Sequence, residues 1–239
     1  VVWLRCGDLR LRDNPALHEA ASTCDEVSVC FCWCPWEEGT AGGPGAERLQ
    51  QDWSLQGTAL QLLIGEALRG LDGRLREDYG SHLLLLGGDA DDPAARRHGA
   101  RELLLGVLDA ARANHSRSAT QAVESALYWN RRVEPWERVR EASVGTAARA
   151  AGHVVHACDG GFLFREPEAC PIFEAVGRGQ HIFKAFWEGW HRGGQIRKAL
   201  DAPRKCTPPE AAMVQAAIDA LPKGCACLLA EALRRGGGW

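Results

Sequence analysis

The sequence predicts an α/β fold: a doubly wound, mostly parallel, five-stranded Rossmann-like sheet with helices on both faces, followed by an irregular or helical linker. Two observations predict it. Short runs of apolar, β-branched and aromatic residues recur along the first part of the chain, as is typical of buried strands. Helical patterns lie between these runs, and strands that alternate with helices form parallel sheets through right-handed crossovers.

Five runs have the composition of strands, and the first of them, VVWL, opens the chain. Apolar residues continue along each run, which is typical of strands covered on both faces. The expected strands are Val1–Leu4, Glu26–Trp33, His82–Gly87, Glu124–Trp129 and His153–Ala157.

Helix signals separate the strands. Asn14 followed by Pro15 is typical of an N-cap and a first helical position. Pro93 and Pro135 are expected to open two further helices, and Gly152 to end the second of these. The expected helices are Pro15 to about Ala21, Glu47–Leu71, Pro93 to about Ala113, Pro135–Ala151 and a short one over Ala211–Ala220.

The pattern changes after about residue 165, so we expect an α/β domain over residues 1–165 and a different organisation over residues 166–239. Ile182–Trp190 is aromatic-rich and helix-like, and Arg192–Pro209 has the composition of a linker. The tail from Lys223 to Trp239 is expected to have no element to pack against.

Composition excludes several function classes. Hydrophobic residues make up 46% and charged residues 25%, as in ordinary soluble globular proteins. The net charge of −3 provides no positive field of the kind that lets a domain bind nucleic acid by itself. No apolar run approaches the roughly 20 residues of a membrane span, and no signal peptide is present. We therefore expect a soluble intracellular protein without a membrane partner. The missing initiator Met indicates a fragment or an incomplete gene model.

The ten cysteines are expected to fill space rather than to bind metal or form disulfides. Cys30, Cys32 and Cys34 alternate, so they share one face of a predicted strand. The spacings of Cys and His lack the paired pattern of zinc sites, so no metal is assigned.

Charged residues crowd the turn where the first strand leads into the first helix. In an α/β sheet this turn lies at the carboxyl edge, where ligands bind. A salt-bridged surface loop is the alternative interpretation of the same residues. The loops Pro35–Gly45, Gly87–Asp92 and Asn130–Pro135 are expected to converge on the same rim. None of them has the spacing of a dinucleotide fingerprint or a P-loop.

Three separated segments resemble motifs of the DNA photolyase/cryptochrome family, in the family's order. They are Trp3-Leu4-Arg5 followed by DLRLRDNPAL from Asp8, LYWNRRVEP from Leu127 to Pro135, and IFKAFWEGW from Ile182 to Trp190. The resemblance covers Val1 to about Pro222, and it identifies the chain as similar to the amino-terminal α/β domain of that family.

The resemblance implies that this domain binds an antenna chromophore, a folate, a deazaflavin or a flavin, in the rim crevice. It also implies that the catalytic FAD, the electron-relay tryptophans and the DNA-binding cleft belong to a carboxy-terminal helical domain that would begin within residues 166–239. That FAD-binding domain is then the partner of this one, damaged DNA is reached only through it, and no catalytic residue is assigned here.

The residues that the resemblance implies for chromophore binding carry charge and lie near the rim. Departures from the family pattern leave the chromophore's identity open: Cys34 stands where an Asp is frequent, Gln51 where an Arg is common, and Trp136 where an Asn is found in folate-binding members. The expected binding residues are Arg5, Asp8, Arg10, Arg48, Glu134 and Glu137.

Three functions remain open. The parent protein is a light-driven carbon–carbon lyase that repairs pyrimidine dimers, or a blue-light receptor with the same fold and FAD but no repair. Alternatively, the chain is a free-standing α/β module that binds a nucleotide-like ligand or a partner. The WNRR-x-EP form of the second motif favours the photolyase branch.

Overall fold

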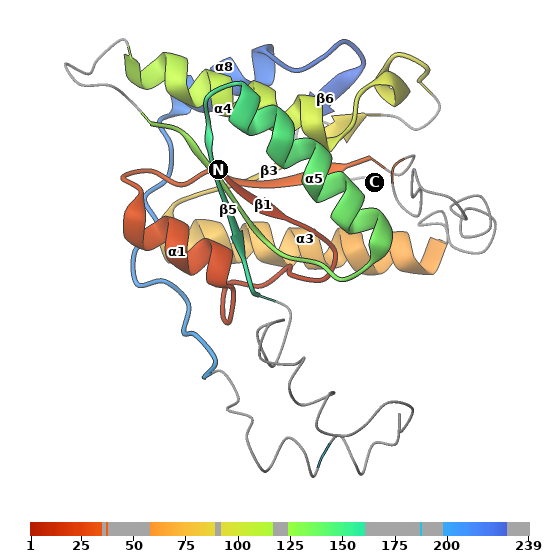
Figure 1. Cartoon of the computed structure of the whole chain (residues 1–239). Helices are drawn as coiled ribbons and strands as arrows, with labels where there is room; N and C mark the ends of the chain where they lie inside the picture. The colour runs from red at the N-terminus through yellow and green to blue at the C-terminus, as the bar shows by residue number, and fades with distance from the viewer. Residues whose placement is uncertain are drawn as a thin grey trace.

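The computed structural model of the chain describes residues 1–34, 37, 58–88, 92–116, 124–160, 187 and 198–228. They form a sheet with helices on both faces, so the predicted doubly wound, mostly parallel fold is confirmed (Figure 1). The strand order is β5-β4-β1-β2-β3-β6. The strands are β1 (Val2–Leu4), β2 (Val29–Trp33), β3 (Leu83–Gly88), β4 (Ala126–Asn130), β5 (Val154–Cys158) and β6 (Cys225–Cys227).

The sixth strand was not predicted. β6 pairs antiparallel with β3, with Leu86 opposite Cys227 and Gly88 opposite Cys225. The expectation that the tail has nothing to pack against is therefore wrong for these residues. Three residues are too few to show a period of two, and only the exposed edge of β3 gives them hydrogen-bonding partners.

Helices form one layer on each side of the sheet (Figure 1). α1 and α3 pack against one face, and α4, α5 and α8 lie on the other. Each face has its own buried apolar cluster, so the sheet is covered on both sides. The helices are α1 (Pro15–Thr23), α3 (Thr58–Tyr79), α4 (Ala100–Ser116), α5 (Pro135–Ala150) and α8 (Ala211–Asp219), with a 3₁₀ turn, η1, over Ala95–Arg97.

Two helix starts are confirmed and one is wrong. The Asn14 side chain accepts a hydrogen bond from the Leu17 N–H at 3.1 Å and caps α1, and Pro135 opens α5. Pro93 does not open α4, because His98 takes an extended conformation that ends η1. α4 begins two residues later, where the Glu102 carboxylate accepts the Gly99 N–H at 2.9 Å.

The cysteines of β2 pack in the core, as predicted. Cys30, Cys32 and Cys34 are all buried in the cluster beneath α4. Burial raises the pKa of the Cys30 thiol to about 12, so it stays protonated and unreactive. Among the described residues no group of three or more His, Cys, Asp or Glu is arranged to hold a metal ion.

Residues 198–210 fold back over the α/β unit as an extended strap. The Asp13 N–H donates to the Leu200 carbonyl at 2.7 Å, and the Val27 N–H donates to the Thr207 carbonyl at 2.9 Å. The Tyr79 hydroxyl donates to the Pro203 carbonyl at 2.7 Å. These bonds attach the strap to α1, α3 and the start of β2. Apart from Trp187, the third motif, Ile182–Trp190, lies outside the described residues.

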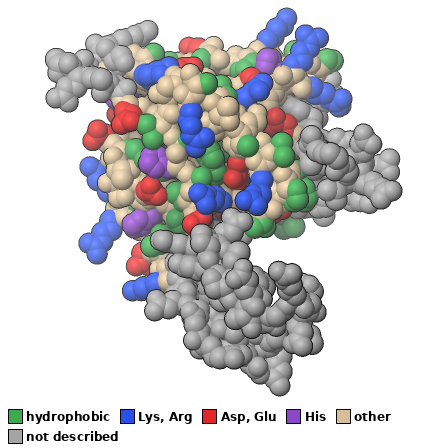
Figure 2. Space-filling view, viewed as in Figure 1, with side chains coloured by type: hydrophobic (Ala, Val, Ile, Leu, Met, Phe, Trp, Pro, Cys, Tyr) green, Lys and Arg blue, Asp and Glu red, His purple; other side chains and the backbone are tan. Residues whose placement is uncertain are grey.

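The described surface carries acidic and basic side chains interspersed over the face seen in Figure 2. This distribution agrees with the net charge of −3. Within the described ranges, the helices are each too short or too polar to cross a membrane.

Candidate functional site at the carboxyl edge of the sheet

Arg5 follows β1 directly and anchors the carboxyl edge. Its guanidinium lies 3.1 Å from the Glu137 carboxylate and 2.6 Å from that of Glu141, both on α5. It also donates to the Asn130 carbonyl at the end of β4 and lies 4.7 Å from the centre of the Trp3 ring. Arg5 therefore ties β1, β4 and α5 together.

Asp8 and Asn130 form the second part of this edge. The Asn130 amide donates to Asp8 at 3.0 Å and to Asn14 at 2.8 Å, while its oxygen accepts the Ala16 N–H at 3.0 Å. Burial raises the pKa of the Asp8 carboxyl, and the nearby Arg5 and its backbone N–H act in the opposite direction. The amide of Asn130 thus links the turn, the start of α1 and β4.

The Arg10 N–H donates to the Asp8 carbonyl at 2.7 Å, but the side chains of Arg10 and Glu134 contact groups other than the Asp8 carboxylate. Arg10 donates to the Asp13 carbonyl at 3.0 Å and to the Gly160 carbonyl at 2.9 Å, so it closes the turn against the end of β5. Glu134 pairs with Arg132 at 2.7 Å. Arg48 lies outside the described residues, as do all of residues 38–57 and 89–91.

Of the predicted site residues, the structure brings Arg5, Asp8 and Glu137 into one buried network. Their charged atoms contact other protein groups. In the structure, these residues therefore fix the shape of the rim. Sequence analysis kept a salt-bridged surface loop as an alternative; the ion pairs are present, but the network is buried rather than at the surface.

A cleft of about 180 Å³ opens beside this network, between α5 and the start of α4. Arg140 crosses its base, 3.3 Å from Glu137 and 3.2 Å from Glu37, and Glu37 also accepts the Ala100 N–H at 3.0 Å. The half-buried Trp136 forms one wall. The cleft is lined by Glu37, Arg101, Trp136, Val139, Arg140, Ser143 and Val144.

Sequence analysis missed Arg140, Arg101 and Glu37. One signal for Arg140 was available: it lies three positions after Glu137 on a predicted helix, so the two side chains share a face. Glu37 gave no such signal, because it belongs to a loop, and Arg101 reaches the cleft only through the fold of η1 and α4.

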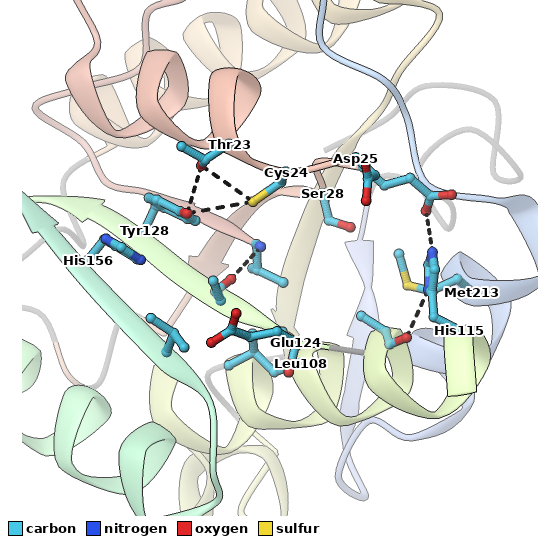
Figure 3. A pocket seen from close by; sticks show the side chains of 16 residues that line it. Thr23, Cys24, Asp25, Ser28, Leu108, His115, Glu124, Tyr128, His156 and Met213 are labelled. Carbon is cyan, nitrogen blue, oxygen red and sulfur yellow. Dashed lines mark hydrogen bonds and ion pairs between the residues drawn. The ribbon is translucent and has the colours of Figure 1, made fainter. Parts of the chain in front are cut away.

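A second cavity, of about 640 Å³, lies at the opposite, amino edge of the sheet (Figure 3). Figure 3 shows Thr23 and Cys24 pointing toward the Tyr128 hydroxyl, which lies 2.9 Å from Thr23 Oγ1. The Tyr128 and His156 rings stack, with their centres 4.4 Å apart. Sequence analysis did not predict this cavity, because it joins residues that precede three different strands with the first residue of a fourth.

The comparison with protein families decides the lineage. The model of the family described as DNA photolyase matches residues 1–210. The chain belongs to the DNA photolyase family. The resemblance found in its motifs is thereby confirmed. No curated protein matches this photolyase-family chain.

Solved structures share the fold. A cryptochrome from Synechocystis sp. PCC6803 matches 88% of this chain with a TM-score of 0.63 and 17% identity. A class III photolyase from Agrobacterium tumefaciens matches 88% with a TM-score of 0.55 and 22% identity. A Sulfolobus tokodaii photolyase, crystallised with two FAD molecules that imply a novel light-harvesting cofactor, matches 90% with a TM-score of 0.53 and 17% identity.

This photolyase-family chain spans only part of those proteins: 37% of the cryptochrome, 35% of the Agrobacterium photolyase and 41% of the Sulfolobus photolyase. At these identities, the structural similarity shows that the fold is shared. It does not assign the activities of the longer proteins to this chain.

Proposed function

We propose that this chain is the light-harvesting part of a photolyase/cryptochrome-like flavoprotein and that its carboxyl-edge cleft holds part of an antenna chromophore. The observation that supports this most is the position of the cleft. It lies beyond the carboxyl ends of parallel strands, where α/β sheets bind ligands, in a domain of the photolyase family.

The chemistry of the cleft fits one ring system of a flavin, deazaflavin or folate. Its 180 Å³ is below the roughly 300–1,000 Å³ of complete ligand pockets, so only part of such a molecule would enter. Trp136 offers a ring face, Arg101 and Arg140 offer donors to carbonyl or anionic groups, and Glu37 offers an acceptor for ring N–H groups. These residues would bind and orient the chromophore, which supplies the light absorption.

The longer parent protein is proposed to carry FAD in a helical domain and to repair pyrimidine dimers under blue light. A blue-light receptor without repair and a free-standing ligand-binding module remain the alternatives. Sequencing the gene beyond codon 239 tests this part of the proposal. If no FAD-binding helical domain follows, both the repair function and the receptor function are contradicted. The free-standing module is then the remaining hypothesis.

Binding is tested on the purified chain with FMN, FAD and folic acid, by ligand fluorescence anisotropy and tryptophan quenching. We expect one of the three to bind and Trp136→Ala and Arg101→Gln to weaken that binding at least tenfold. Arg74→Gln, which changes an exposed ion pair with Asp78 on α3, is the matched control and should bind as the unaltered chain does. If the chain binds none of the three compounds, the antenna proposal is contradicted.

A further inference from the structure

The amino-edge cavity lies outside the proposed chromophore cleft and has the size of a small-molecule site. Its volume of about 640 Å³ falls within the roughly 300–1,000 Å³ typical of ligand pockets. Leu108 of α4 and Met213 of α8 contribute apolar side chains to the lining (Figure 3). Val154, the first residue of β5, also lines the cavity. The cavity therefore favours an uncharged, largely apolar ligand.

A serine on the cavity wall is the first member of a chain of side-chain contacts. Ser125, the residue before β4, has its hydroxyl oxygen 2.6 Å from Nδ1 of His153, the residue before β5. Nε2 of the same imidazole lies 3.3 Å from Oδ1 of Asp109 on α4. Ser125 and His153 are buried, at 8% and 3% exposure. Nucleophile, base and orienting carboxylate are thus in contact, as in sites that activate a serine.

The surroundings hold His153 in the form that a general base needs. Burial is the main cause that lowers the pKa of the imidazole; Arg112 acts in the same direction and Asp109 in the opposite one. The amino group of Val1 also lowers this pKa. At neutral pH the ring is therefore neutral. Nε2 lies within ion-pair distance of Asp109 but makes no hydrogen bond to it. In the tautomer that carries its hydrogen on Nε2, Nδ1 can accept the proton of Ser125, whose oxygen lies 2.6 Å away.

Asp109 is fixed in turn by Arg112. The Arg112 guanidinium lies 2.7 Å from Asp109 Oδ1 and donates to the Ala151 carbonyl at 2.9 Å, just after α5. The carboxylate is therefore held by a side chain that is itself attached to a second helix. Asp109 is a positioning residue in this arrangement.

We propose that Ser125 is a nucleophile that accepts acyl groups from uncharged esters bound in the amino-edge cavity, with His153 as its general base. The exposed carboxylates Asp25 and Glu124 on the cavity lining disfavour anionic esters. The class of substrate is then an ester with a short apolar acyl chain.

The reaction balances without any further group. The Ser125 oxygen attacks the ester carbonyl carbon while its proton moves to Nδ1 of His153. The bond from that carbon to the alcohol oxygen breaks, and the leaving alkoxide takes the proton. Water then attacks the acyl-serine in the same way, so that a carboxylic acid forms and Ser125 regains its hydrogen.

The experiment uses the whole chain with p-nitrophenyl butyrate as substrate and an alkyl fluorophosphonate as a serine label, with peptide mass spectrometry to locate the adduct. We expect hydrolysis above the buffer rate and an adduct on Ser125. Ser125→Ala and His153→Gln should lower the rate about 100-fold, the low end of what a positioned base contributes. Ser22→Ala is the matched control and should hydrolyse the ester as the unaltered chain does, because Ser22 is an exposed serine of α1 outside the cavity lining.

The pH profile separates a reacting His153 from a structural one. The rate should rise as His153 loses its proton. Asp109→Asn should move this rise to lower pH, because Asp109 raises the pKa of His153, and Arg112→Gln should move it to higher pH. Circular dichroism spectra verify that each variant is folded. An adduct on the Val1 amine, no adduct at all, or full activity in Ser125→Ala would overturn the proposal.

Discussion

The Arg5 guanidinium and the Glu137 carboxylate meet at 3.1 Å although 132 positions separate them in the chain. Both side chains are more than nine-tenths buried, at 4% and 8% exposure. Glu141 and Arg140 extend the pair on either side. A buried charge is tolerated only when it is paired and hydrogen-bonded, so each member of this network depends on the others.

Replacing Arg5 tests that dependence. Arg5→Met leaves Glu137 and Glu141 buried without their partner and should lower the free energy of unfolding by about 3–5 kcal/mol. Urea denaturation followed by circular dichroism measures the loss. Arg12→Met is the control in the same turn: its pair with Asp201 is 79% and 92% exposed, so the cost should stay below about 1 kcal/mol. Equal losses in both variants would refute this interpretation.

Asn130 carries no charge, so it is expected to matter through the hydrogen bonds of its amide. Asn130→Ala leaves Asp8 Oδ2 and the Ala16 N–H without their buried partner and should cost about 1–3 kcal/mol for each unsatisfied group. Thermal and urea unfolding report the loss. Asn114→Ala removes only a surface hydrogen bond to Glu210 and should cost much less. A small effect for Asn130→Ala would show that water replaces the amide.

Met213 tests whether α8 belongs to the core. It is 1% exposed and packs in the cluster shared with α4. Met213→Ala should lower the free energy of unfolding by about 2–5 kcal/mol through lost burial and a residual cavity. Leu62→Ala on α3, where the side chain is 67% exposed, should change it by less than about 0.5 kcal/mol. If Met213→Ala is as mild as Leu62→Ala, α8 does not pack stably in solution.

Acid should destabilise the fold in part through His153. Its pKa is lowered in the folded chain, so the folded state binds fewer protons there than the unfolded state. This contribution is present above the unfolded pKa of about 6.5 and is lost as pH falls through the folded pKa. The free energy of unfolding is measured with urea at about pH 7.5 and at about pH 5. Its decrease between the two should be smaller in His153→Gln than in the unaltered chain.

His115 should contribute to the pH dependence of stability with the opposite sign, so it serves as the control. Its pKa is raised, first by its hydrogen bond to the Ala111 carbonyl and further by Glu26. Its contribution is present below the unfolded pKa and is lost as pH rises through the folded one. His115→Gln should make the loss on acidification larger. If both variants change the loss of stability on acidification in the same direction, the assigned directions of the two pKa shifts are contradicted.

Local signals predicted much of the fold. The cap at Asn14 and the proline at the start of α5 act within one turn of helix, so they can be recognised without knowing the neighbours. The start of α4 was missed because a 3₁₀ turn and an extended His98 come between Pro93 and the helix. β6 was missed because a three-residue edge strand exists only where another strand has left its edge open.

The candidate sites were harder to predict than the fold. Arg5, Asp8 and Glu137 were identified as a rim group, but their mutual burial was not. The contact between Ser125 and His153 had no sequence signal, since each residue merely precedes a strand. It arises because β4 and β5 are parallel neighbours, which places their first residues side by side.

The sequence by itself determined the fold class and the family, because both are carried by hydrophobic periodicity and by short motifs whose residues are close together along the chain. Only the tertiary structure decided which charges neutralise one another and which cavities remain open. Those outcomes depend on strand order and helix packing, which bring Arg5 to Glu137 at one edge of the sheet and Ser125 to His153 at the other.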